Sequence, residues 1–341
     1  MAPHGATASL LASLAVAKAS LTLVPTLLMP AAIEIAPTLH GPAATSFETF
    51  ASAVNDLQKK MIATAKLADP TASWTEDEHS RGRAVILEDG EIWEKGCISV
   101  TLIKDGELSA VRASTISGRT GTSIEAGSSY SACALSFVLH ARSPRVPTLR
   151  GDVRVFVVGD DQWYGGGIDL TPTYVDEADC IHFHSKLAAL CNTHGTPDTY
   201  ATMKQTCDEY FYLPARAEHR GVGGVFFDDL KADWAPEFSR SLINLALDDD
   251  GPYMPIVRKH ASCQYTDAEK KWQLLRRGRY IEFNLLYDRG VKFGLSPESV
   301  ERVLVSSPPL VAFKYKAEPM AGTPEAETLA VLRHPRDWVK T

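Results

Sequence analysis

The chain of 341 residues lacks several patterns that would assign it to common functional classes. No two of its six cysteines form a Cys-x-x-Cys pair, so neither a zinc cage nor a thioredoxin-like motif is expected, and the thiols are predicted to be buried and reduced. The formal net charge of −7 disfavours a nucleic-acid-binding protein, because such proteins usually carry a basic surplus. Neither Gly-x-Gly-x-x-Gly nor Gly-Lys-Ser/Thr occurs, which excludes the usual dinucleotide and P-loop fingerprints.

Long hydrophobic and basic segments are also missing. The apolar run Leu21–Ala32 is interrupted by Pro25 and Pro30 and is too short to span a bilayer. No arginine precedes Arg81, so an arginine-rich transit peptide is not expected. We therefore expect residues 1–45 to be a disordered or weakly ordered extension and residues 46–341 to be a single domain. We also expect no integral membrane segment and a cytoplasmic location, with a mitochondrial location as the alternative.

The hydrophobic pattern predicts helices and strands in separate runs. Apolar residues at three- and four-residue steps predict a first helix from Ser46 to about Ala68. A hairpin is predicted at 83–88 and 91–104, around the turn Asp89-Gly90. Asp105-Gly106 predicts a second turn, and a segment rich in Ser, Thr and Gly at 113–130 predicts a mobile flap. Further strands are predicted at 134–140, 152–158, 162–170, 222–228, 280–287 and 310–316, and further helices at 176–193, 198–212, 236–248, 252–261, 266–276 and 324–332. Strands in runs, without strict alternation with helices, indicate an α+β fold with a large, mainly antiparallel sheet flanked by helices.

A run of three glycines in Trp163–Pro172 is the first candidate site. Successive glycines at a strand allow a flat ligand to approach the backbone closely, and Asp169 lies just beyond them. The alternative interpretation is a β-bulge followed by a surface aspartate.

The second candidate is Arg216–Asp229, where two arginines precede a glycine turn and a hydrophobic strand that ends in two aspartates. Arg216 and Arg220 are suited to bidentate recognition of carboxylates. Alternatively, they form a structural network with Glu218, Asp228 and Asp229. Adjacent strand residues face opposite sides, so the two aspartates cannot point into one pocket without a bulge.

The third candidate is the segment Arg276–Gly294. If it is a strand, Arg279, Ile281, Phe283 and Leu285 share one face, and the opposite, more polar face lines a cavity or a subunit interface. A solvated sheet face is the alternative.

These segments resemble the signature blocks of the oxygen-dependent (aerobic) coproporphyrinogen III oxidase family. The resemblance rests on Lys204–Asp229 and on the C-terminal block Leu332–Trp338, and it extends from about residue 47 to the end. It implies a large antiparallel sheet sandwiched between helices and a homodimer. It also implies a reaction with molecular oxygen as co-substrate and without an organic cofactor. Some bacterial members are described as metal-dependent through four histidines, but only His140 and His184 match these positions, so no metal is expected. The family converts the propionates on rings A and B of coproporphyrinogen III to vinyl groups, giving protoporphyrinogen IX, carbon dioxide and hydrogen peroxide.

The resemblance also implies roles for individual residues. Asp169 and Arg220 are expected to be catalytic, and Ser136, Arg150, Asp152, Arg154 and Arg216 to bind substrate. The sequence departs from the family at four places: Arg150 replaces a histidine proposed as a proton donor, Asp152 an asparagine, Ala215 a histidine, and Ser296–Ser299 a Gly-Gly-Arg loop.

Three hypotheses about chemistry follow. Asp169 accepts pyrrole N–H bonds and stabilises the developing cation. Arg150 binds a substrate carboxylate, and Asp152, on the same strand face, holds its guanidinium. His184 is a satisfied core histidine on a helix face shared with Ile181, Leu187 and Cys191.

Two other functions remain open at this point. One is a porphyrin-binding relative with weakened or no catalysis, suggested by the departures from the family. The other is a metal-dependent hydrolase built on His140, His184 and the aspartate pair, although two histidines are a poor set of metal ligands.

Overall fold

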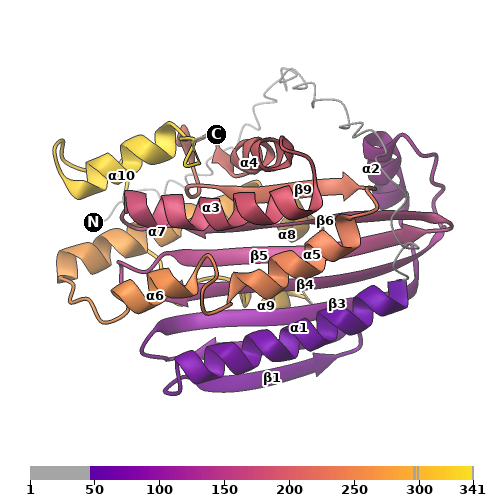
Figure 1. Ribbon diagram of the computed structural model, residues 1–341, viewed down its shortest axis with the longest axis horizontal. Coiled ribbons are helices and arrows are strands. Elements are labelled where there is room, and N and C mark those ends of the chain that lie inside the picture. Colours follow the sequence, from indigo (N-terminus) through magenta and orange to yellow (C-terminus); the bar gives the residue numbers. More distant parts are fainter. Residues whose placement is uncertain (1–46, 295–296, 298, 340–341) are drawn as a thin grey trace, which may run out of the picture. The chain divides into compact units, whose positions relative to one another are not determined.

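The computed structural model describes residues 47–294, 297 and 299–339, which belong to one compact unit. Its centre is a seven-stranded sheet in the order β1-β2-β3-β4-β5-β6-β9, in which every neighbouring pair is antiparallel (Figure 1). The strands are β1 (Ser73–His79), β2 (Gly82–Glu88), β3 (Trp93–Glu107), β4 (Ser129–Ala141), β5 (Thr148–Val158), β6 (Asp161–Thr171) and β9 (Gly224–Leu230). A separate two-stranded ribbon pairs β7 (Tyr212–Leu213) with β8 (Glu218–His219).

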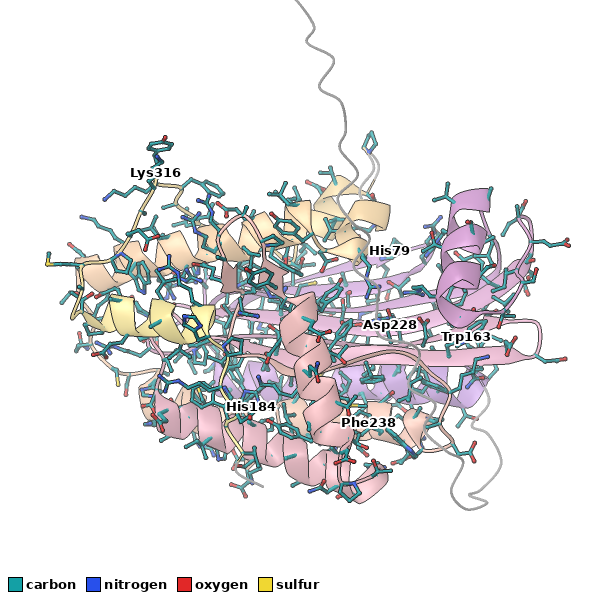
Figure 2. The ribbon with its side chains drawn as sticks, turned by 90° about the horizontal axis from the view of Figure 1, so that it is seen from above. His79, Trp163, His184, Asp228, Phe238 and Lys316 are labelled. Carbon is teal, nitrogen blue, oxygen red and sulfur yellow. The ribbon has the colours of Figure 1, made fainter. Side chains whose placement is uncertain are left out.

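Helices cover both faces of the sheet (Figure 2). The helices are α1 (Phe47–Ala68), α2 (Ala110–Thr120), α3 (Glu177–His194), α4 (Thr199–Tyr210), α5 (Ala235–Ala246), α6 (Met254–His260), α7 (Asp267–Leu286), α8 (Arg289–Gly294), α9 (Val300–Leu304) and α10 (Pro324–Arg333). The predicted α+β class, with an antiparallel sheet between helices, is therefore confirmed.

One face of the sheet carries the main hydrophobic core. Because side chains alternate along a strand, Leu149, Val153 and Val155 of β5 point to this face and are fully buried. They pack in one cluster with Phe50 of α1 and Phe238 of α5, together with residues of α3 and α6.

The opposite face carries two smaller apolar clusters, one towards each end of the strands. At one end, Tyr280 and Ile281 of α7 pack against Ala84, Cys97 and Val138 of the sheet. At the other end, Ala113 and Ile116 of α2 form a small cluster that includes the strand residue Tyr130. Polar side chains of β4, β5 and β6 lie between these two clusters, and they include most of the predicted site residues.

Many predicted elements are confirmed with small shifts of their ends. These are α1, the hairpin of β2 and β3, the strands β4, β5, β6 and β9, and the helices α3, α4, α5, α6 and α10. Ser46, the predicted start of α1, and residues 1–45 lie outside the described residues. Five of the six cysteines are buried and Cys263 is exposed, and all six are free thiols. Among the described residues, no helix is long and apolar enough to cross a membrane.

Four predictions are wrong. Residues 280–287 do not form a strand, because all but the last belong to α7, so Arg279, Ile281, Phe283 and Leu285 do not share a strand face. Residues 310–316 have no regular secondary structure. The predicted flap contains α2, whose N-terminus is capped by the Ser109 side chain and whose C-terminus is capped by Gly121 at a left-handed φ of 71°.

The fourth error is the turn at Asp105-Gly106. Strand β3 continues through this dipeptide to Glu107, and the irregularity is taken up by a register shift between Ile103 and Gly106. Asp105 has a left-handed φ of 53° within this bulge.

Candidate active site

Five of the predicted site residues share one face of the sheet. The strand register places Ser136 opposite Asp152, and Arg150 opposite Asp169, so all four side chains project to the same side. Arg154, two residues after Asp152, projects with them, as the alternation along the strand predicts. We call Ser136, Arg150, Asp152, Arg154 and Asp169 the polar strip.

The glycine run makes room for the strip. Gly165 lies opposite Arg154, and a Cβ atom at this position would lie 2.8 Å from the Nε atom of Arg154. Gly166, at a φ of 155°, lies at a register shift between β6 and β9. A bulge is therefore present, but Asp169 is only 3% exposed and is not the surface aspartate of the alternative interpretation.

Asp169 forms a buried ion pair with Arg220. The Nη2 atom of Arg220 donates to Oδ1 of Asp169 at 2.7 Å, and its Nη1 atom donates to Oδ1 of Asn284 at 3.1 Å. The guanidinium lies 3.8 Å from the ring centroid of Phe211. Burial raises the pKa of the Asp169 carboxyl, and the positive charge of Arg220 opposes that rise. This arrangement suits a carboxylate that is held in place out of water.

Arg154 is the centre of a second, half-buried network. It donates to Asp152 at 2.5 Å and to Asp228 at 3.0 Å. Asp228 also accepts from Arg119 of α2 at 2.9 Å and from Arg289 of α8 at 3.3 Å. Burial raises the pKa of Asp228, but the three guanidinium groups outweigh burial and leave the pKa below its usual value.

The aspartate pair of β9 converges on one guanidinium. Arg119 bonds Asp228 through Nη1 at 2.9 Å and Asp229 through Nη2 at 3.2 Å. The two side chains reach the same partner because Asp229 has a left-handed φ of 53°, which breaks the alternation of the strand. This agrees with the expectation that the two aspartates share a site only through a bulge, because the register of β6 and β9 shifts between Phe227 and Leu230.

Arg150 is not held by Asp152, so this part of the prediction is wrong. Its Nη1 atom donates to the backbone oxygens of Phe137 at 3.0 Å and Gly151 at 2.7 Å. Asp152 instead bonds Arg154. Within the described part of the chain, Arg150 has no carboxylate partner, although it lies directly across from Asp169. A guanidinium in this position is available to an anionic ligand.

Arg216 does not lie with the other site residues. Its Nε and Nη2 atoms donate to the two oxygens of Glu282 at 2.8 and 2.7 Å. Glu282 also accepts from Arg279. The side chains of α7 that contact Arg220 are Tyr280, Phe283 and Asn284, on another side of the helix from Glu282. The alternative network, in which Arg216 and Arg220 pair with Glu218, Asp228 and Asp229, is also absent among the described contacts of these two arginines.

Comparisons with known proteins identify the family. The family model described as coproporphyrinogen III oxidase matches residues 49–338. The chain belongs to the coproporphyrinogen III oxidase family. It is 42% identical to the mouse mitochondrial oxygen-dependent coproporphyrinogen-III oxidase over 276 residues, which cover 78% of this chain and 62% of the relative. The corresponding human protein is also 42% identical, over 78% of this chain and 60% of the relative.

A bacterial relative is matched over nearly its whole length. The oxygen-dependent coproporphyrinogen-III oxidase of Francisella philomiragia is 37% identical over 314 residues, which cover 87% of this chain and 98% of the relative. The chain spans about three-fifths of the length of the mammalian relatives. The resemblance drawn from the signature blocks is confirmed.

The two histidines matching the family's proposed metal ligands are far from forming one site. His140, on the face covered by α7, donates through Nε2 to the Ser306 carbonyl at 2.9 Å. His184, on α3 across the sheet (Figure 2), donates through Nε2 to the Val222 carbonyl and accepts from the Tyr200 hydroxyl. Burial lowers the pKa of each imidazole to about 3. His184 is therefore a satisfied core histidine, as predicted, although Ile181 of the same helix is exposed.

One group of potential metal ligands was not anticipated. Ligand atoms of Asp176, Asp179 and His260 lie within 4.8 Å of one another. The ammonium of Lys259 bonds both carboxylates, at 2.9 and 2.8 Å, and so supplies the positive charge there. We regard this group as an ion-pair network at the start of α3.

Arg119, Arg289 and Asn284 are the site residues that sequence reasoning missed. Arg119 lies in the segment expected to be a flap. Asn284 and Arg289 lie in the third candidate segment, where the strand assignment gave them no relation to Asp169 or Asp228. A helix prediction for this segment would have placed Asn284 one turn after Tyr280, on the side of the helix that contacts Arg220.

Proposed function

We propose that the chain is an oxygen-dependent coproporphyrinogen III oxidase that forms protoporphyrinogen IX in haem biosynthesis. Two propionates of the substrate become vinyl groups, and each conversion consumes one O2 and releases one CO2 and one H2O2. The observation that carries the proposal is the buried Asp169–Arg220 pair beside Arg150, whose guanidinium has no carboxylate partner among the described residues, in a chain that belongs to this family.

The substrate explains why arginines and one carboxylate lie on the same sheet face. A coproporphyrinogen carries four carboxylates and four pyrrole N–H groups. Arg150 and Arg154 supply guanidinium groups for the carboxylates, and Ser136 supplies a hydroxyl beside them. Asp169 supplies an acceptor for the pyrrole N–H groups. Asp152 and Asp228 hold Arg154 in the absence of substrate, and a propionate can replace one of them.

In the proposed reaction, O2 oxidises an electron-rich pyrrole and a peroxide forms at a pyrrole carbon. The peroxide removes a hydrogen from the β-carbon of the propionate, the carboxylate leaves as CO2, and hydrogen peroxide is released. The Asp169 carboxylate stabilises the positive charge that develops on the pyrrole, and Arg220 orients that carboxylate and favours its ionised form. Because Asp169 is buried, substrate must displace side chains above it, and its cross-strand neighbour Arg150 is not fixed by a carboxylate.

We propose that no organic cofactor or metal takes part. The support is the chemistry of the substrate, since an electron-rich pyrrole reacts with O2 directly and the protein has mainly to orient and desolvate it. Turnover of coproporphyrinogen III by metal-free protein tests this.

We propose that the protein is a homodimer. The support is a segment without regular structure, residues 308–314, that exposes Leu310 by 60% and Phe313 by 62%. Clustered apolar side chains of this kind are typical of an interaction surface. A dimer mass is expected in light scattering at micromolar concentration, and Phe313→Glu should shift it towards the monomer. A monomer mass for the unmodified protein would contradict the proposal.

A cytoplasmic location is also proposed, with a mitochondrial one as the alternative because the mammalian relatives are named mitochondrial. Fractionation of cells that express the full chain distinguishes the two compartments.

The second candidate function is a non-catalytic porphyrin-binding protein. It is favoured by Asp152, which replaces a family asparagine and is already bound to Arg154. Such a protein would bind coproporphyrinogen III but would not convert it in air, so a turnover assay separates the two functions.

A further inference from the structure

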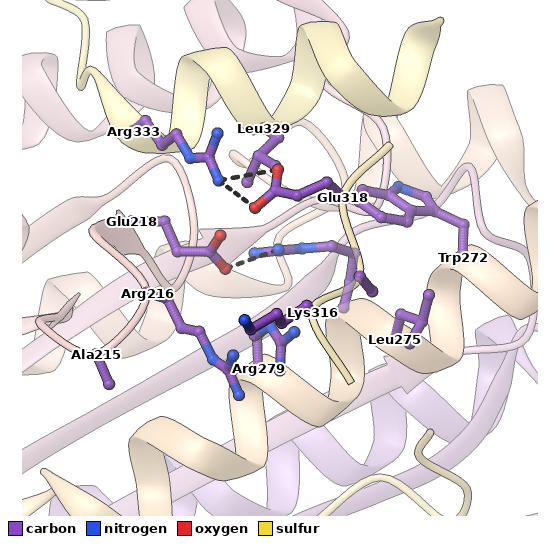
Figure 3. A pocket seen from close by; sticks show the side chains of 12 residues that line it. Ala215, Arg216, Glu218, Trp272, Leu275, Arg279, Lys316, Glu318, Leu329 and Arg333 are labelled. Carbon is purple, nitrogen blue, oxygen red and sulfur yellow. Dashed lines mark hydrogen bonds and ion pairs between the residues drawn. The ribbon is translucent and has the colours of Figure 1, made fainter. Parts of the chain in front are cut away.

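A pocket lies beside α7, next to the side of the helix that carries Trp272, Arg276 and Arg279. It has a volume of about 310 Å³ and is enclosed by α7, α10, the turn around Ala215 and the segment 316–318 (Figure 3). None of the residues of the polar strip lines it. Its volume is at the lower end of the range for small-molecule pockets.

The pocket is strongly cationic in an acidic protein. Its lining includes the five cationic side chains Arg216, Arg276, Arg279, Lys316 and Arg333, but only two carboxylates, Glu218 and Glu318. Glu282, which bonds Arg216 and Arg279 from outside the lining, leaves the group with a positive surplus. The whole chain has a formal net charge of −7, so the surplus is local. Such a concentration of guanidinium groups favours oxyanions.

Arg276 and Lys316 stand out among these cations, the first by its buried donors without partners and the second by its backbone conformation. Arg276 is 5% exposed and bonds Glu218 through Nη1 at 2.7 Å, but its Nε and Nη2 atoms have no hydrogen-bond partner within the described structure. Lys316 has no carboxylate partner among the residues that the structure describes. It is held at a left-handed φ of 45°, a conformation that a lysine rarely adopts. A buried cation with unpaired donors and a strained cation beside it are typical of a binding site.

One carboxylate of the pocket lining, Glu318, occupies a position that an anionic ligand could take. Glu318 accepts two bonds from Nη2 of Arg333, at 2.8 and 3.1 Å (Figure 3). The side chains of this pair are 62% and 37% exposed, so the pair is weak in water. A ligand with an oxyanion group can therefore replace Glu318 on Arg333 without a large loss of stability.

We propose that this pocket binds a small multivalent oxyanion, a metabolite with two or more carboxylate or phosphate groups. Arg276 and Arg279 form the buried wall, and Arg333 and Lys316 bind the ligand from the open side. The site is distinct from the polar strip, and the proposal does not depend on the oxidase function.

Isothermal titration calorimetry of the full chain at low salt tests the proposal. Citrate and inorganic pyrophosphate serve as the two probes, since one offers carboxylates and the other phosphates. One site per chain is expected for at least one probe, and the preferred probe identifies the ligand class. Binding that weakens as salt rises is expected, because the contacts are ionic.

Four variants locate the site. Lys316→Gln should weaken binding about three- to fivefold, and Glu318→Gln should tighten it by a similar factor because the internal competitor is removed. Lys314→Gln is the matched control: it makes the same change in charge two residues away, outside the pocket, and should leave affinity unchanged. Arg154→Gln, in the polar strip, should also leave it unchanged.

The proposal fails if neither probe binds at about 1 mM. It also fails if Lys314→Gln weakens binding as much as Lys316→Gln, which would indicate general surface charge. A loss of binding in Arg154→Gln alone would place the probe on the polar strip and overturn the proposal.

Discussion

The substitution Asp169→Asn tests the buried ion pair at the centre of the site. Asp169 is 3% exposed and Arg220 is 2% exposed, and the guanidinium lies among the rings of Phe211, Tyr280 and Phe283. Removing the carboxylate charge leaves a buried cation without a counter-charge. A change of this kind lowers the free energy of unfolding by about 3–5 kcal/mol. That is a large part of the total stability of an ordinary domain, about 5–15 kcal/mol.

Urea unfolding at pH 7, followed by tryptophan fluorescence, measures the loss. The matched control is Asp161→Asn, in the same strand, which removes the carboxylate from an ion pair with Lys231 whose side chains are 41% and 46% exposed. The control should lose less than about 1 kcal/mol. If Asp169→Asn loses no more than the control, Asp169 and Arg220 are not a buried pair in solution.

The same variant tests the catalytic assignment. Loss of one preorganised charged contact lowers the rate about 100- to 1000-fold, and turnover is measured where the urea curve shows that the variant is folded. The double variant Asp169→Asn with Arg220→Met should be more stable than the sum of the two single losses predicts, because both charges are removed together. Turnover near that of the unmodified protein would remove Asp169 from the mechanism.

The remaining predictions concern Arg150, pH and metals. Arg150→Ala should raise the KM about tenfold or more, as expected for the loss of a charge-assisted bond of about 1.5–3 kcal/mol, whereas Arg150→His should stay active. Normal substrate affinity in Arg150→Ala would contradict this. His140 and His184 have folded pKa values of about 3, far below the usual value of about 6.5, so unfolding takes up protons between these limits. Above about pH 6.5, these two histidines should not change the free energy of unfolding. As the pH drops from there towards 3, each histidine should lower it by up to about 1.4 kcal/mol for every pH unit. Urea titrations across this range measure the slope, and a flat profile would show that the imidazoles are not buried and neutral. EDTA should leave turnover unchanged, and a loss of activity that added metal restores would overturn the metal-free mechanism.

The sheet was predictable because its strands have strong local patterns. Strand β5 alternates buried Leu149, Val153 and Val155 with polar Arg150 and Asp152, and this alternation placed the polar strip on one face correctly. Strand β1 was missed because its sequence is almost entirely polar. It is an edge strand whose residues are all exposed or half-buried, so no hydrophobic alternation marks it.

The errors arose in segments whose local secondary-structure preference differs from the structure that tertiary packing stabilises. Residues 280–286 contain aromatic and β-branched residues that favour a strand, but they continue a helix that begins with the capping box of Thr266 and Glu269. Once the helix is formed, Tyr280, Ile281 and Asn284 recur at helical spacing towards the sheet. In α2, the many serines and threonines suggested a loop, whereas Ser109 and Gly121 are in fact its two caps.

The site was predictable in its residues but not in its pairs. Side-chain alternation and the glycine run placed the site residues of β5 and β6 on one face of the sheet. The partners of the arginines depend on α2, α7 and α8, which come from distant parts of the sequence. The prediction that Asp152 holds Arg150 failed because Asp152 bonds Arg154. The grouping of Arg216 with Arg220 failed because Arg216 bonds Glu282, whereas Arg220 bonds Asp169.

Aerobic incubation with coproporphyrinogen III tests the central claim most directly. The products are oxidised to porphyrins and separated by chromatography, and CO2 and H2O2 are measured in parallel. We expect protoporphyrin to accumulate, with two CO2 and two H2O2 released per substrate, and we expect no conversion when O2 is removed. If the purified, folded protein binds coproporphyrinogen III but forms no vinyl product in air, the chain is a porphyrin-binding protein and not the oxidase proposed above.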